Sequence, residues 1–104
     1  MYTKHTKKIP LGKLLQTLGI TEKELRSAVR TQRLSDARAM AAAVLSQHFH
    51  LSQIAIAELF KVTQPGVCRM KRRHQNLLQF NAGYRQRWEN VINTISNHSK
   101  TNNL

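Results

Sequence analysis

The sequence predicts a small all-α domain that contains a helix-turn-helix and ends in an amphipathic helix. Apolar residues recur every three or four positions in several segments, which is the spacing of one face of a helix. Between these segments stand Ser, Thr, Pro and Gly, the residues that start and end helices. No pair of alternating apolar segments joined by a hairpin turn occurs in the sequence. With 104 residues, the chain has the length of one domain.

The first two helices are expected within residues 10–29. Pro10 precedes, and Gly19 follows, a segment whose four leucines share one face, an asymmetry typical of helix ends. Thr21 and Glu24 have the spacing of a capping box, which predicts a second helix from residue 22. The side chains expected on the buried face of this second helix are Leu25, Ala28 and Val29.

Two further helices are predicted before the most basic segment. Ser35 is the expected N-cap of an Ala-rich helix, and Asp36 in its first turn favours the positive end of the helix dipole. Alanine is a strong helix former and allows a neighbouring helix to approach closely. Ser52 is the expected N-cap of a short helix over residues 53–60.

The last two helices and the chain ends complete the predicted organisation. Thr63 is the expected N-cap of a helix over residues 64–76, with Pro65 in its first turn, where a missing N–H does no harm. Residues 9–80 form the main domain, and residues 81–97 form a C-terminal helix. Residues 1–8 are expected to be a flexible basic arm and residues 98–104 a disordered tail. The apolar stripe of the C-terminal helix consists of Tyr84, Trp88, Val91, Ile92 and Ile95.

The charge balance indicates a polyanionic partner. Seventeen Lys and Arg residues stand against five Asp and Glu residues, which gives a formal net charge of +12. Such an excess destabilises the compact state by self-repulsion, so we expect nucleic acid as the partner, with an anionic membrane surface as the second choice. The sequence has no apolar run long enough to span a bilayer and no signal peptide. Cys68 is the only cysteine, which fits a protein of the reducing cytoplasm.

Residues 53–72 have the pattern of a helix-turn-helix, with Lys61 and Val62 as the turn. Val67 and Met70 anchor the second helix, so its opposite side is left to face outward. Gln is suited to pair with adenine and Arg with guanine, which assigns base contacts to Gln64 and Arg69. The other basic residues of the segment are expected to bind phosphates. The predicted DNA-binding residues are Lys61, Thr63, Gln64, Pro65, Gly66, Arg69, Lys71, Arg72 and Arg73.

At these residues the chain resembles the small helix-turn-helix repressors of conjugative plasmids, the KorA/TrfB type, and more loosely the PapB-like regulators. The likeness covers positions 20–75 and consists of "ITEKEL", an Ala-rich helix, "LSQIAIAELFKVTQPGVCRMKRR" and a helical tail. It implies a dimeric repressor of plasmid promoters that binds short inverted repeats in double-stranded DNA, with residues 64–73 as the recognition helix. The chain also resembles, more loosely, the DNA-binding domain of the replication initiator DnaA. The "DHTTV" signature of that family is absent from this sequence, which reads "TQPGV" there.

The sequence leaves alternatives open for the role of the C-terminal helix and for the class of protein. The stripe of the C-terminal helix is either a homodimer seam or packs on its own domain. A basic RNA-binding or ribosome-associated protein fits the net charge equally well. An enzyme or metal protein has the least support, because His48, His50 and Cys68 do not make up a tetrahedral ligand set or a nucleophile with its base. We therefore expect no catalytic residue, no metal, no cofactor and no small-molecule ligand. We also expect no membrane partner, because the charge is concentrated on a short motif whose apolar positions are explained by core packing.

Overall fold

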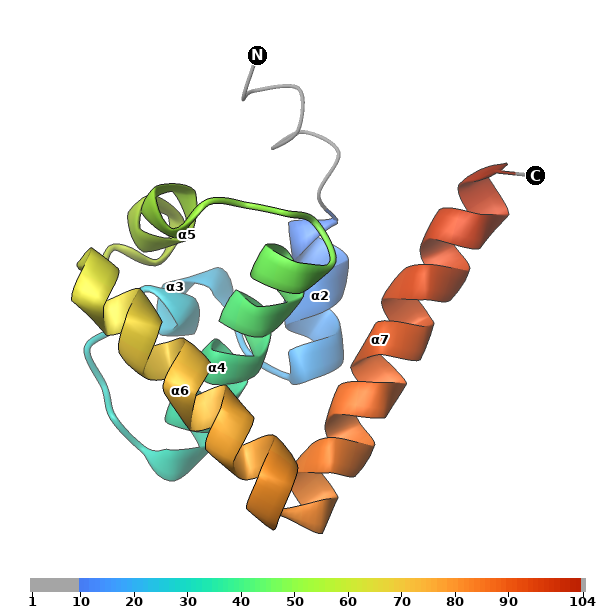
Figure 1. The fold of residues 1–104 in the computed structure, drawn as a ribbon. Coiled ribbons are helices and arrows are strands. Elements are labelled where there is room, and N and C mark those ends of the chain that lie inside the picture. The colour runs from blue at the N-terminus through green and yellow to red at the C-terminus, as the bar shows by residue number, and fades with distance from the viewer. Residues whose placement is uncertain (1–9, 104) are drawn as a thin grey trace.

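The computed structural model describes residues 10–103, with side chains up to residue 96, and all regular structure in this range is helical. This confirms the predicted all-α class. No helix in the described range combines the length and the apolar character that crossing a membrane requires. The helices, shown in Figure 1, are α2 (Leu11–Leu18), α3 (Glu22–Leu25), α4 (Gln32–Gln47), α5 (Gln53–Phe60), α6 (Gln64–Phe80) and α7 (Ala82–Asn103).

Several helices begin and end where the sequence predicts, because the expected capping groups are in place. The hydroxyl of Thr21 accepts the N–H of Glu24 at 3.0 Å, and the carboxylate of Glu24 accepts the N–H of Thr21 at 3.0 Å. Ser52 and Thr63 cap α5 and α6 with their hydroxyls in the same manner. Gly19 ends α2 with φ of 76°, a conformation that favours glycine.

The second helix is shorter than expected, and the prediction that Ala28 and Val29 are buried is wrong. α3 ends at Leu25, and both of these side chains lie exposed in the following loop. The hydroxyl of Ser27 accepts the N–H of Val29 at 2.9 Å. A local bond of this kind gives the backbone an alternative to the helix and so ends the periodic pattern.

The N-cap predicted for the Ala-rich helix is also wrong. α4 begins at Gln32, and the hydroxyl of Thr31 accepts the N–H of Leu34 at 3.2 Å. Ser35 therefore lies inside the first turns of α4. Both Thr31 and Ser35 are good capping residues, and the earlier one starts the helix because Leu34 is then buried in the core.

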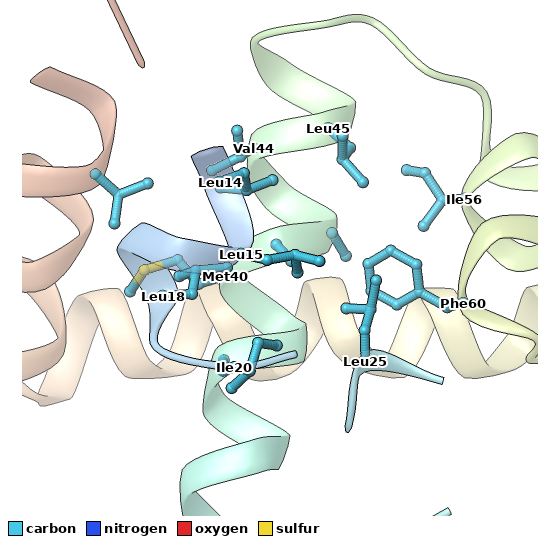
Figure 2. Packing of buried hydrophobic residues seen from close by; sticks show 14 of the residues in the cluster. Leu14, Leu15, Leu18, Ile20, Leu25, Met40, Val44, Leu45, Ile56 and Phe60 are labelled. Carbon is cyan, nitrogen blue, oxygen red and sulfur yellow. The ribbon is translucent and has the colours of Figure 1, made fainter. Parts of the chain in front are cut away.

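The central helix is α4, whose middle is buried on all sides. The side chains from Ala39 to Leu45 are all buried, as expected for a helix that is surrounded by others. In Figure 2, apolar side chains from α2, α3, α4 and α5 meet in one interior. The small alanines of α4 let α6 lie close across it, and Figure 1 shows α6 in front of α4.

The C-terminal helix packs on its own domain, which is one of the two alternatives that the sequence leaves open. α7 lies against α2 and α6 (Figure 1), and Tyr84, Val91 and Ile95 belong to the core of the single chain. Trp88 and Ile92 are partly buried against the same core. Three of the five side chains of the stripe are therefore covered within the single chain. α7 also continues to Asn103, through most of the tail that we expected to be disordered, whereas the arm over residues 1–8 lies outside the described residues.

Candidate nucleic-acid interface

The turn between α5 and α6 has the form that the helix-turn-helix pattern predicts. The N–H of Val62 donates to the carbonyl of Ala57 at 2.9 Å, and the N–H of Lys61 donates to the carbonyl of Glu58 at 3.3 Å. These two bonds define a helix end that normally contains glycine. Lys61 occupies the glycine position with φ of 59° and ψ of 45°, which is the left-handed conformation. A residue other than glycine is strained there by roughly 1–2 kcal/mol.

α6 has a buried side and an exposed side, as the sequence predicts. Val67 is fully buried and Met70 is partly buried, which fixes this side of α6 in the core. Thr63, Gln64, Pro65, Arg69 and Arg72 are exposed, and Gly66 is half-buried. One shallow surface depression is lined by Gln53, Gln64, Pro65, Cys68, Arg69 and Arg72. The residues assigned to base contacts, Gln64 and Arg69, therefore lie on the same open surface.

Gln53 is a residue of this surface that the sequence reasoning missed. Its side-chain amide donates to the backbone carbonyl of Gln64 at 3.2 Å and contacts the Sγ of Cys68 at 2.8 Å. It thereby ties the first turn of α5 to the first two turns of α6. The only signal in the sequence is its position directly after the Ser52 cap, from which a long side chain can reach the crossing helix.

Most arginines of the chain are used to hold the fold together. Six of the nine arginines donate to acceptors within the described residues, which are helix-end carbonyls or carboxylates. Arg30, Arg69 and Arg72 make no hydrogen bond or ion pair with any described residue, and two of these three lie in the depression beside Gln64. The six engaged arginines are Arg26, Arg33, Arg38, Arg73, Arg85 and Arg87.

Arg73 departs from the predicted outward arrangement. Its Nε and Nη2 both lie 2.8 Å from Oδ1 of Asp36 on α4. Arg73 therefore points toward α4 and does not line the depression that Arg69 and Arg72 line. The sequence could not show this, because the two partners are 37 positions apart.

The remaining predicted site residues flank the depression. Lys61 is exposed and lines a second shallow depression, which also contains Gln64 and the carboxylate of Glu58. Lys71 is half-buried on α6. A Cβ added at Gly66 would meet the Oγ1 of Thr63 at 3.4 Å, an ordinary contact, so the packing does not require a glycine there.

His74 connects the candidate interface to α7. Its side chain is 1% exposed, and its Nδ1 lies 2.7 Å from the hydroxyl of Tyr84. The centre of its ring is 4.5 Å from that of Trp88 in an edge-on arrangement. Burial lowers the pKa of His74 from 6.5 to about 4, and burial also raises the pKa of Tyr84, so both groups are neutral at pH 7. The Nε2 of His74 has no hydrogen-bond partner among the described residues.

The described residues form no comparable cluster of metal-ligating side chains. Among the side chains that the structure describes, no three His, Cys, Asp or Glu groups gather where they could hold a metal ion. Cys68 is an exposed free thiol on α6. Comparison with known proteins does not add a relative, because no protein-family model and no curated protein matches the sequence.

Proposed function

We propose that this protein is a sequence-specific double-stranded DNA-binding transcriptional repressor of the cytoplasm. The observation that supports this function best is that Arg69 and Arg72, which have no partner among the described residues, share one exposed surface with the amide of Gln64. The surface lies at the start of a helix whose other side is buried. In a helix-turn-helix the second helix enters the major groove with its N-terminal residues at the base edges.

The individual roles follow from the chemistry of the side chains. The amide of Gln64 can donate to and accept from adenine, and the guanidinium of Arg69 can donate to both acceptors of guanine. Lys61, Lys71 and Arg72 neutralise phosphates, which positions α6 without reading sequence. Gly66 has no side chain near the start of α6, which allows the backbone to approach the duplex closely there.

A homodimer on an inverted repeat remains part of the proposal, in line with the resemblance to the KorA/TrfB type. Since Tyr84, Val91 and Ile95 are buried within one chain, the contact between two copies must use other surfaces. The described residues offer Phe80, which is 79% exposed at the end of α6. A symmetric dimer requires half-sites about one helical turn apart.

The RNA-binding alternative has weaker support. Proteins that bind single-stranded RNA stack bases on exposed aromatic rings. Tyr84 is buried and Trp88 is partly buried here, and the exposed ring of Phe80 lies at the opposite end of α6 from Gln64. Competition of a bound duplex by structured RNA distinguishes the two functions, because a DNA-binding repressor keeps its duplex.

The proposed function is tested by selecting bound sequences from a random duplex library and then comparing two variants. Arg69→Ala should reduce the preference for the selected site by roughly 1–3 kcal/mol, because a bidentate contact to guanine is lost. Lys71→Ala should weaken all duplexes alike and lower the salt slope by about one unit. Recovery of no common sequence, together with wild-type binding by both variants, would refute the assignment of this surface.

A further inference from the structure

The ion pair between Arg73 and Asp36 has the geometry of a structural clamp. Both the Nε and the Nη2 of Arg73 lie 2.8 Å from the same carboxylate oxygen. The side chain of Asp36 is only 17% exposed, and that of Arg73 is 43% exposed. Asp36 lies near the start of α4, the central helix of the fold, so the pair connects α6 to the most buried element of the protein.

The residue next to Arg73 provides a second connection from the same point of α6. His74 contacts Tyr84 and Trp88 of α7. Two consecutive residues therefore hold the middle of α6 against α4 on one side and α7 on the other. Towards its N-terminus, α6 is held by the packing of Val67 and by the bonds of Gln53. The connections at positions 73 and 74 thus contribute to the placement of α6 against α4 and α7.

We infer that Arg73 is a positioning residue of the DNA-reading helix and not a phosphate ligand, an inference that rests on the proposed function. Asp36 occupies the Nε and Nη2 of Arg73. A phosphate that approached the remaining donors of this guanidinium would lie close to the Asp36 carboxylate, which repels it. The neighbouring Arg72 has no partner within the described residues and is free to bind phosphate. Two adjacent arginines of one helix therefore have different roles, and Asp36 causes the difference.

The matched variants Arg72→Gln and Arg73→Gln test this inference. Each removes one positive charge from neighbouring positions of α6, and the measurement is duplex affinity against salt concentration for the selected site and for random DNA. Arg72→Gln should lower the salt slope by about one unit and weaken both duplexes equally. Arg73→Gln should leave the salt slope unchanged and reduce the ratio of specific to random affinity by up to about fivefold, the contribution of a partly exposed ion pair.

A charge exchange provides the rescue. Arg73→Asp alone should lower the specificity ratio further, and the double variant Asp36→Arg/Arg73→Asp should restore most of it, because the pair is re-formed with its charges reversed. An aspartate at a phosphate contact would not be rescued in this manner. Circular dichroism tests whether each variant is folded. If Arg73→Gln does not fold, Asp36→Asn replaces it, and the same fall in specificity ratio is expected.

The outcomes separate the inference from the proposed function. An equal fall in salt slope for Arg72→Gln and Arg73→Gln would overturn the positioning role and leave DNA binding intact. Failure of the charge exchange, or an unchanged specificity ratio in both Asp36→Asn and Arg73→Gln, would also overturn it. If the wild-type protein shows no salt-dependent binding of any duplex, the proposed function itself is wrong and the inference falls with it.

Discussion

Acidification should destabilise this protein through His74 at pH values well above those at which carboxylates are protonated. In the folded state the ring is buried beside Tyr84 and Trp88, and its pKa is about 4. In the unfolded chain the ring takes up a proton near pH 6.5. Between these two values the unfolded state binds more protons than the folded state, so the free energy of unfolding falls as the pH falls.

The magnitude follows from the two pKa values. A decrease from 6.5 to about 4 corresponds to about 3.5 kcal/mol of stability at about 1.4 kcal/mol for each pH unit. About 2 kcal/mol of this should be lost by pH 5 relative to pH 8, and the rest as the pH approaches 4. For a domain of this size the loss at pH 5 is a decrease in Tm of roughly 10 °C.

Urea denaturation followed by circular dichroism at pH 8, 7, 6 and 5 measures the effect. The control is the double variant His74→Leu/Tyr84→Phe, in which both partners of the buried hydrogen bond become apolar; such a replacement is close to neutral at pH 8. This variant should keep its stability down to pH 5. Tyr84→Phe alone should be less stable by about 1 kcal/mol yet retain the pH dependence, since burial and not the hydroxyl lowers the pKa of His74. A wild-type stability that is constant from pH 8 to 5, or an equal loss in the double variant, would refute this reasoning.

Three further substitutions probe the helix-turn-helix itself. Gly66→Ala should raise stability by about 0.5–1 kcal/mol because the site tolerates a Cβ, and a lower Tm would contradict this gain in stability. Duplex affinity of the same variant should fall if the backbone approaches DNA at this position. Lys61→Gly should stabilise the fold by about 1 kcal/mol by relieving the left-handed conformation and should lower the salt slope of duplex binding, so a loss of stability in urea would count against strain at the turn. Ala57→Leu should destabilise the protein by about 1–3 kcal/mol, because Ala57 is buried at the helix crossing; an unchanged urea midpoint would exclude tight packing there.

The sequence predicted those parts of the fold that depend on neighbouring residues. The caps at Thr21, Ser52 and Thr63 and the glycine end at Gly19 need only groups within four positions, and all four are found. The start of α4 was misplaced because two capping residues compete within one turn. Only the burial of Leu34 in the tertiary structure favours Thr31.

The parts that could not be predicted depend on which elements meet in space. The stripe of α7 fits a dimer seam and a core equally well, since both bury the same side chains. Its docking on α2 and α6 depends on partners far away in sequence. One of these is Leu18, whose carbonyl accepts a hydrogen bond from Arg87 of α7 at 3.3 Å. The same limit applies to Arg73. In the sequence its charge is equivalent to that of Arg72, and only the fold places Asp36 beside it.

The net charge of +12 therefore does not show how many guanidinium donors are open to a polyanion. The guanidinium group has several donors in a fixed plane, and it remains charged under all conditions in a protein. These properties suit it to helix-end carbonyls, and this chain uses Arg26, Arg33, Arg85 and Arg87 for that purpose. A binding partner that responded to total charge would meet those engaged groups all over the surface. A partner that needs free donors would find two of the three arginines without a described partner on α6, beside an amide that can read a base edge. Under the proposed function, the fold directs DNA to one face because it occupies most of the arginines elsewhere.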